Sequence, residues 1–530
     1  MRRKLLVLAG FLMMIAGCED PTKDINLHIA PSFYKYVVEV ELQDLGDPDE
    51  LFSGDAKIKV SGSDAAKIYT IDGKSIPADG VKPNFGSVQL ITTRAAEPKP
   101  GSPLRFTVEV VSNTYRSESM EIEVEEEDYY VSRSLMLLNL KNLPAGINFL
   151  ETTASLNANG ELDQPLVFNT DATTGNTSQL EMTIPAGIKF MDENGAVLSG
   201  SNLKVEVLNF SDTTFAAQLA LPNNTGALQK LEVNGQEYNV ILHPTLNYEI
   251  NMSIDGQEVR RFSGNGIELN MPLADHMFNY QANRDYQVGD QVSLISYSSG
   301  NTAWQDDGAS TIVSEGGKLR VKPSVNHLTL FKLYDNISGV DLGKSSKIVF
   351  INNTSKAINQ SLYLGYEIGR SNFAVKYALN MKAGATQEFT WAITGDLKTV
   401  KFYYADRFPD HDITFSNEKV ETTFKEPDNS VQVGYRLFCP SSNAFVIPPA
   451  GVKIYYRKTS EGGKFNHLYT FTGEDLSNKL QKVKQLSDGE FYDLKAYYGE
   501  YEVDTSNVQV EDQKIYEINL PKALCNEIGF

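Results

Sequence analysis

Apolar and polar residues alternate one by one through many short stretches of this 530-residue chain. In the stretch LEMTI, residues 180–184, the alternation puts Leu180, Met182 and Ile184 on one side, and residues 203–207 repeat it. Successive side chains of a strand point to opposite faces of a sheet, so this period predicts half-buried antiparallel strands. Such strands have one face in a core and the other in water.

Asn-Gly and Asp-Gly pairs separate many of these stretches. Asn or Asp followed by Gly tolerates the positive φ angles that two-residue hairpins require. Short strands interrupted this often predict an all-β fold of tandem β-sandwich domains, immunoglobulin-like or transthyretin-like. One stretch departs from the pattern, because Leu476, Leu480 and Val483 have helical spacing and predict a helix over residues 474–486. The six pairs are Asp72-Gly73, Asn159-Gly160, Asn194-Gly195, Asn234-Gly235, Asp255-Gly256 and Asp488-Gly489.

The N-terminus has the three parts of a secretion signal. Arg2, Arg3 and Lys4 form a positive segment, residues 5–16 form an apolar one, and Cys18 follows two small residues. The apolar run is shorter than the roughly 20 residues of a membrane helix, so it predicts a cleaved signal peptide. The alternative is an ordinary signal peptide with an incidental cysteine.

The ending IAGC, residues 15–18, resembles the lipobox of bacterial lipoproteins. In that family the signal is cut before the cysteine, so the resemblance implies that Cys18 carries the lipid and anchors the protein to a membrane. Glu19 and Asp20 behind it resemble the surface-export signal of Bacteroidetes lipoproteins. Together these resemblances imply an outer-membrane lipoprotein displayed at the cell surface.

The charge balance argues against one class of partner. Removing the signal takes three basic residues and no acid, which leaves 45 of the 48 basic residues against 68 acidic ones, a net charge of −23. Binding to nucleic acid depends on clustered Lys and Arg, so we expect no nucleic-acid partner. The acidic balance suits a well-solvated protein outside the cytoplasm.

A chain of this length predicts several domains, with boundaries where strand-like sequence gives way to loop-like composition such as NLPAGI and KEPDNS. The sequence divides into a signal peptide (1–17), a lipidated cysteine with its tether (18–28), a β-sandwich (29–143), a larger β module (144–340), a second β-sandwich (341–427) and a C-terminal β-sandwich (428–530).

The larger module carries the most specific motifs. It contains LEMTIPAGIKFMDENGAVLSGSNLKVEVLNF, then LEVNGQEYNVI and IELNMPL, and finally YQVGDQVSLISYSSGNTAWQDDGASTIVSEGGKLRVKPSVNHLTLFKL. This order resembles the extracellular module of cartilage intermediate layer protein and astroprincin, which also occurs in Bacteroidetes surface lipoproteins. The chain departs from that family after His327, where Leu328, Thr329 and Leu330 stand in place of aromatic residues. The resemblance implies an extracellular, non-catalytic β-protein.

The last domain, with VKIYYRKT and DGEFYDLKAYYG, resembles carboxypeptidase-regulatory-like sandwiches. Its two cysteines, Cys439 and Cys525, lie near its two ends. In an oxidising compartment they predict a disulfide between the first strand and the C-terminal tail. Two independent buried thiols are the alternative.

The sequence contains none of the common catalytic motifs that we considered. The six histidines have no metal-ligand spacing, and the chain lacks a GxSxG elbow, a P-loop and a dinucleotide-binding glycine pattern. Two acidic groups, Asp306-Asp307 and Asp410-His411-Asp412, suit a hydrolase only if their carboxyl groups face each other across a cleft. We expect both acidic groups to lie in solvated turns. Trp304, just before the turn at Asp306-Asp307, should cover one end of the core. We expect His327 to be a hydrogen-bonded core residue.

Three further features suggest binding or modification. Tyrosine doublets, as at Tyr129-Tyr130 and Tyr497-Tyr498, should place one ring outward or at an interface. The acidic stretch 44–50 has oxygen ligands suited to Ca²⁺ but lacks EF-hand spacing, so a plain loop is expected. Asp212-Thr213-Thr214 resembles the Bacteroidetes O-glycosylation acceptor, which makes Thr213 a candidate modified residue.

These features predict a non-catalytic surface lipoprotein that acts as a binding or structural protein, has a protein or a glycan as its partner, and needs no cofactor or metal. Two alternatives stay open: a carboxylate- or metal-dependent hydrolase directed at glycans, and a periplasm-facing assembly factor that offers a sheet edge to a client.

Overall fold

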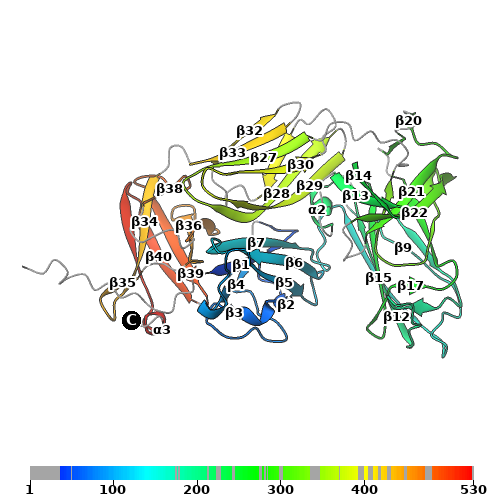
Figure 1. The fold of residues 1–530 in the computed structure, drawn as a ribbon, viewed down its shortest axis with the longest axis horizontal. Helices are drawn as coiled ribbons and strands as arrows, with labels where there is room; N and C mark the ends of the chain where they lie inside the picture. The colour runs from blue at the N-terminus through cyan, green and yellow to red at the C-terminus, as the bar shows by residue number, and fades with distance from the viewer. Residues whose placement is uncertain are drawn as a thin grey trace, which may run out of the picture.

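The computed structural model shows an almost wholly β protein, as the alternating sequence predicts (Figure 1). No described helix has the length and hydrophobicity to cross a membrane. The signal peptide, Cys18 and Thr213 lie outside the described residues. The structure describes residues 36–527, with gaps at 49–50, 174–175, 177–178, 212–213, 222–227, 242–244, 274–276, 280–281, 283, 298–302, 335–345, 369–370, 392–398, 404–409, 416–418, 427–430, 447–449, 472–479 and 500.

The first domain packs a four-stranded sheet, β3-β4-β1-β7, on a three-stranded sheet, β2-β5-β6. Alternation builds its core: in β5, Leu104, Phe106, Val108 and Val110 are buried, and the residues between them are more exposed. The first and last strands, β1 and β7, pair in parallel. The elements are β1 (Val37–Asp44), β2 (Lys57–Ser61), η1 (Ala65–Lys67), β3 (Ile68–Thr70), β4 (Ser87–Thr92), η2 (Arg94–Ala96), β5 (Leu104–Val111), β6 (Glu118–Val124) and β7 (Tyr130–Leu137).

The second domain packs a six-stranded sheet on a nine-stranded one. Strand β10 ends at Ile184, the first residue of the stretch IPAG, and Gly187 in the same stretch has a φ of +71°. Its elements are β8 (Ile147–Ser155), β9 (Leu166–Asn169), β10 (Glu181–Ile184), β11 (Phe190–Met191), β12 (Asn202–Phe210), α2 (Phe215–Leu219), β13 (Leu228–Val233), β14 (Gln236–Ile241), β15 (Asn247–Ile254), β16 (Gln257–Val259), β17 (Arg261–Phe262), β18 (Ile267–Pro272), β19 (Phe278–Asn279), β20 (Arg284–Asp285), β21 (Gln291–Tyr297), β22 (Trp304–Thr311), β23 (Val313–Glu315), β24 (Lys318–Val321), β25 (Ser324–Val325) and β26 (Leu330–Tyr334).

The third domain packs sheet β30-β27-β33-β32 on sheet β29-β28-β31, and its first and last strands, β27 and β33, again pair in parallel. Three phenylalanines, Phe350, Phe389 and Phe424, lie together in its core. Its strands are β27 (Ser346–Asn353), β28 (Ile358–Ile368), β29 (Ser371–Met381), β30 (Thr386–Trp391), β31 (Thr399–Tyr403), β32 (Asp410–Phe415) and β33 (Lys419–Lys425).

The fourth domain repeats the parallel pairing of first and last strands, here β34 and β41. Cys439 in β34 and Cys525 in α3 form a disulfide bond with Cα atoms 5.7 Å apart, as expected for the first strand and the C-terminal tail. The elements are β34 (Val431–Cys439), β35 (Ala444–Val446), β36 (Lys453–Lys458), β37 (Asn466–Thr470), β38 (Gln481–Val483), β39 (Phe491–Tyr498), β40 (Tyr501–Gln509), β41 (Lys514–Asn519) and α3 (Lys522–Glu527).

Three local expectations need correction. The predicted helix at 474–486 is wrong where it is described, because β38 pairs Val483 with Val431 in the sheet. The predicted turn at QDDG is also wrong, because these residues continue β22; Asp307 and Gly308 together oppose one residue of β21, as in a β-bulge. Positive φ at both turn residues occurs only at Asn234-Gly235 and Asp255-Gly256, whereas the other four pairs have it only at the glycine.

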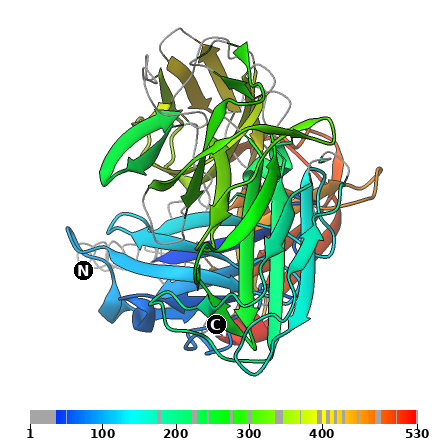
Figure 2. The same cartoon turned by 90° about the vertical axis from the view of Figure 1, so that its right-hand side faces the viewer.

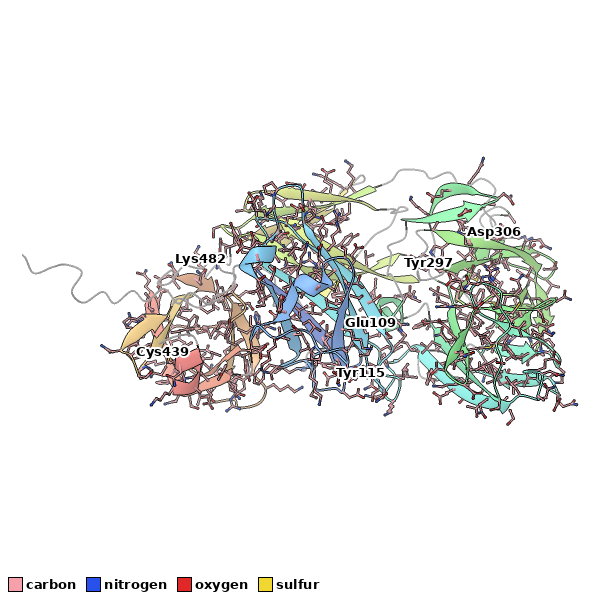
Figure 3. All side chains as sticks on the ribbon, turned by 60° about the horizontal axis from the view of Figure 1, so that its bottom comes forward. Glu109, Tyr115, Tyr297, Asp306, Cys439 and Lys482 are labelled. Atoms are coloured by element: carbon pink, nitrogen blue, oxygen red, sulfur yellow. A yellow bond between two sulfur atoms is a disulfide. The ribbon has the colours of Figure 1, made fainter. Side chains whose placement is uncertain are left out.

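The first domain contacts all three others. In Figure 1 it lies below the third domain and between the second and the fourth, and Figure 2 views the molecule from the end that the second domain occupies. Figure 3 places Cys439 at one end and Asp306 at the other. Arg116 joins the first domain to the second. Its guanidinium lies 3.0 Å from a carboxylate oxygen of Glu249 and donates a hydrogen bond to the carbonyl of Ala220, the residue that follows α2.

Replacing both cysteines, in Cys439→Ser/Cys525→Ser, should destabilise the fourth domain. The bridge closes a loop with a sequence separation of 86, and the loss of such a constraint costs about 4–5 kcal/mol in the chain-entropy model. Hydrogen exchange of peptides from β34 to β41 at increasing urea measures this loss. Reduced wild-type protein should behave like the variant, and an unchanged urea midpoint in both would contradict the prediction.

Candidate functional site

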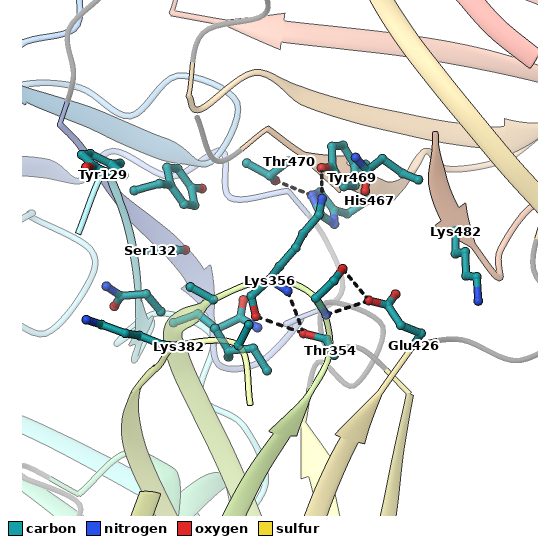
Figure 4. Close-up of a pocket in the computed structure, with 18 of the residues that line it drawn as sticks. Tyr129, Ser132, Thr354, Lys356, Lys382, Glu426, His467, Tyr469, Thr470 and Lys482 are labelled. Atoms are coloured by element: carbon teal, nitrogen blue, oxygen red, sulfur yellow. Dashed lines mark hydrogen bonds between the residues drawn. The ribbon is translucent and has the colours of Figure 1, made fainter. Parts of the chain in front are cut away.

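A cavity of about 590 Å³ lies where the first, third and fourth domains meet (Figure 4). The first domain contributes the turn before β7 and part of β7, within residues 127–132. The third contributes the loop 354–357 and the start of β28, and the fourth contributes segments 467–470 and 481–485. The volume falls within the roughly 300–1,000 Å³ typical of small-ligand sites.

A buried ion cluster beside the cavity holds the first and fourth domains together. The ammonium of Lys453 on β36 lies 2.5 Å from a carboxylate oxygen of Glu39 and 2.9 Å from one of Glu41, both on β1. The side chains of Lys453 and Glu39 are 4% and 0% exposed. Tyr130 on β7 donates its hydroxyl proton to Glu39. Glu41 and Tyr130 also line the cavity, so the cluster forms part of its wall.

Electrostatics favours the charged form of this lysine. Burial alone would lower the pKa of Lys453, but the charges of Glu39 and Glu41 outweigh burial and raise the pKa above the usual lysine value. Burial and the charge of Glu39 together raise the pKa of Tyr130 well above its usual value. Tyr130 therefore remains a hydrogen-bond donor to Glu39.

Backbone contacts tighten the same junction. Gln89 and Asn84 of the first domain donate side-chain hydrogen bonds to the carbonyls of Gly451 and Gly499 in the fourth. Gly451 has a φ of +90°, and a Cβ there would lie 2.6 Å from the Gln89 amide nitrogen, so this approach requires glycine. Phe85 of the first domain also contacts the fourth, since its ring centre lies 3.8 Å from that of Tyr497. Its backbone has a φ of +47°, which is strained for a bulky residue.

The first and third domains meet through the backbone of Ser134 in β7. Its carbonyl accepts hydrogen bonds from the Tyr363 hydroxyl at 2.6 Å and from the Lys376 ammonium at 2.9 Å. Asn359 accepts from Arg133 at 2.8 Å and donates to Asp128 at 3.0 Å. This junction is mostly buried and forms a second fixed wall.

In the part of the chain that the structure describes, the contacts between the third and fourth domains are only partly buried. Lys356 reaches from the loop before β28 to the hydroxyl of Tyr469 on β37, and its ammonium lies 4.7 Å from the centre of that ring (Figure 4). Lys484 pairs with Asp410 at 2.5 Å, with side chains 35% and 28% exposed. Exposed pairs contribute little, about 0–1 kcal/mol, so the Lys484–Asp410 pair holds this seam less firmly than the buried cluster holds the first junction.

The acidic groups singled out from the sequence do not converge on a catalytic pair. In Asp410-His411-Asp412 the chain is extended in β32, so His411 points to the face opposite the two aspartates. Asp410 pairs with Lys484 and Asp412 with Lys425 at 3.1 Å. The turn expected here is therefore wrong, whereas the expected solvation holds for Asp412, whose side chain is 67% exposed; each aspartate is paired with a lysine.

Asp307 meets His327 and Ser296 in the second domain. His327 Nε2 lies 3.2 Å from the Ser296 hydroxyl and 3.6 Å from Asp307, and burial raises the pKa of Asp307. Ser296 is 2% exposed, and Ser296 and Asp307 both face the same ring nitrogen. A nucleophilic serine needs access and a carboxylate on the opposite nitrogen, so this cluster fits a structural network. His327 is hydrogen-bonded and half-buried, and its ring lies 5.4 Å from Phe331.

The acidic stretch at 44–50 is a turn in the part described. Asp44 accepts hydrogen bonds from the amide of Gly46 at 2.8 Å and from the Tyr115 hydroxyl at 2.9 Å. Among the described residues, no group of three or more His, Cys, Asp or Glu is arranged to hold a metal ion.

The tyrosine doublets have the expected interface positions, but the interface lies between domains. Tyr455 and Tyr497 are 3% and 7% exposed, and their rings are 5.2 Å apart at the junction with the first domain. Tyr129 lines the cavity, whereas Tyr404 lies outside the described residues. Trp304 is 6% exposed and packs against Tyr297.

Sequence reasoning missed Lys453, Glu39, Lys356 and Tyr469. Glu39 alternates with valines in VVEVELQ, a pattern that indicates a solvated strand face. Only the docking of another domain buries that face, so no local signal marks it. No protein-family profile and no curated protein matches the chain.

Lys453→Met should cost about 3–5 kcal/mol of unfolding free energy, because it leaves Glu39 and Glu41 buried without their partner charge. Urea unfolding followed by circular dichroism measures the change. The triple variant Lys453→Met/Glu39→Gln/Glu41→Gln should recover most of it. Lys495→Met is the matched control, since its partner Glu502 is 36% exposed, and should cost less than about 1 kcal/mol. Equal losses in the two single variants would refute the assigned role.

Lys376→Met should change the pH dependence of stability. Burial lowers the pKa of Lys376 to about 8, from 10.5. Above pH 8 the unfolded chain holds this proton more tightly than the folded protein, so Lys376 makes stability rise with pH. Between pH 7.5 and 9.5 the unfolding free energy of the wild type should therefore rise by about 1–2 kcal/mol more than that of Lys376→Met. Lys318→Met, at an exposed lysine, should give no such gain; parallel curves for wild type and Lys376→Met would contradict the assignment.

Proposed function

We propose that this protein is a non-catalytic envelope protein that binds a ligand in the cavity between its first, third and fourth domains. The observation that carries the proposal is the unequal strength of the cavity's three sides. Two junctions are mostly buried and hydrogen-bonded, whereas the third, which includes the Lys356–Tyr469 contact, is only partly buried. A site with two fixed walls and one weak seam can admit a ligand without unfolding any domain.

The same proposal includes the location. The lipobox-like IAGC sequence supports lipidation at Cys18 and anchoring in a bacterial outer membrane, and the acidic residues behind it support display at the cell surface. The Cys439–Cys525 disulfide is in keeping with an oxidising compartment. The resemblance of the second domain to the cartilage intermediate layer protein module supports an extracellular, non-enzymatic role. In this proposal that domain is a spacer on the first domain.

Cys18→Ala should abolish metabolic labelling by an alkyne-palmitate analogue and release the protein from the membrane fraction, because the thiol that carries the lipid is lost. Cys439→Ser is the matched control and should keep its label. Labelling that persists in Cys18→Ala would contradict lipid anchoring.

Protease added to intact cells should degrade the wild-type protein while a periplasmic marker survives. Survival of the full-length band until the outer membrane is broken would place the protein on the periplasmic side. That result would overturn surface display and leave the assembly-factor alternative.

A further inference from the structure

We infer that the cavity between the first, third and fourth domains takes a neutral, polyhydroxylated ligand, a segment of an oligosaccharide. This inference rests on the proposed binding function and names the chemistry of its ligand. Three properties of the cavity lead to it: its charge balance, its side-chain amides and its tyrosine rings.

The cavity is nearly neutral in a strongly acidic protein. Among the described residues that line it, Lys356, Lys382, Lys482 and Lys484 are matched by four carboxylates, those of Glu41, Glu127, Asp128 and Glu426. These charges are also engaged locally, since Lys382 pairs with Glu127 and Lys484 with Asp410. Glu426 accepts two hydrogen bonds from Ser355, at 2.8 and 2.9 Å. A polyanionic ligand would find no excess of positive charge, and a polycation no excess of negative charge.

Side-chain amides are concentrated on the same walls. An amide side chain offers donors and an acceptor in one plane, which suits hydroxyl groups that both donate and accept. Ionised groups offer only one of these functions. Besides Asn359, which bridges Arg133 and Asp128, four amides from two domains line the cavity: Gln360 and Asn380 of the third, and Gln481 and Gln485 of the fourth.

Two tyrosines supply apolar surface from different domains. Tyr129 of the first domain and Tyr469 of the fourth lie on different sides of the cavity in Figure 4. The ammonium of Lys356 binds the hydroxyl of Tyr469 and lies 4.7 Å from its ring centre, so the polar tip of this tyrosine points toward the third domain. Tyrosine combines an apolar face with a polar tip, and a pyranose ring needs both, because it has C–H faces and a rim of hydroxyl groups.

The weak seam suits a ligand that is longer than the cavity. A sugar chain that enters between the third and fourth domains displaces the Lys356 ammonium from the Tyr469 hydroxyl and packs beside that ring. The displaced contact is a partly buried hydrogen bond to the Tyr469 hydroxyl, which a ligand hydroxyl group can replace.

The test is isothermal titration of the full-length mature protein in detergent micelles with defined probes. Neutral probes are cellotetraose, maltotetraose and mannotetraose; the anionic probe is tetragalacturonate, and the peptide probe is pentaglycine. We expect saturable binding of at least one neutral tetrasaccharide. Tyr469→Ala and Asn380→Ala should each weaken it about tenfold or more, a loss of about 1.4 kcal/mol.

Conservative and distant variants keep the test specific. Tyr469→Phe keeps the ring and should retain most of the affinity, whereas Gln509→Ala, an amide on β40 away from the cavity, should bind like wild type. Circular dichroism checks that each variant is folded. If Tyr469→Ala does not fold, Asn380→Ala, at an exposed side chain, carries the test.

The outcomes separate the ligand class from the site. Binding of only tetragalacturonate or pentaglycine, weakened by the cavity variants, would overturn the neutral-glycan inference and leave the cavity as a binding site. Binding of a neutral tetrasaccharide that no cavity variant weakens would overturn the site. No saturable binding of any probe at about 10 mM would overturn both the inference and the proposed function.

Discussion

The docking of the fourth domain onto the first depends on one buried lysine. Lys453 of the fourth domain inserts between Glu39 and Glu41 on the outer face of the first domain, where those carboxylates would otherwise face water. Removing ions from water costs several kcal/mol each, so the cluster persists only while its partners and the Tyr130 hydroxyl are in place. Such a contact contributes geometric specificity more than net stability. The strained Phe85 beside it is kept in place by the same junction.

The cavity follows from this geometry. With the fourth domain fixed to the first by Lys453, and the third fixed by Ser134, the remaining seam between the third and fourth domains is closed by Lys356 and a surface ion pair. The three small domains share parallel pairing of their first and last strands. Assembly of three similar units around a polar centre creates a site that none of them has alone.

Much of the fold could be predicted from local patterns, because strand alternation and glycine turns act over a few residues. The disulfide of Cys439 and Cys525 was also predictable from their positions at the two ends of one domain. The helix expected near Val483 was wrong, because pairing with Val431 in the sheet outweighed helical spacing. The cavity residues were missed for a different reason. Glu39 and Lys453 are 414 residues apart in number, and a buried ion pair between domains has the same local pattern as a solvated strand face.

The most direct test of this account is the distance distribution between spin labels on different domains, measured by double electron–electron resonance. Labels at Ser102→Cys and Ser506→Cys report on the first and fourth domains, and labels at Thr414→Cys and Ser506→Cys report on the third and fourth; all three positions are exposed. The account predicts one narrow distribution for the first pair and a broadening of it in Lys453→Met. A broad or two-peaked distribution for the first pair in the wild type would show that the domains are not fixed by the ion cluster, and would contradict the account.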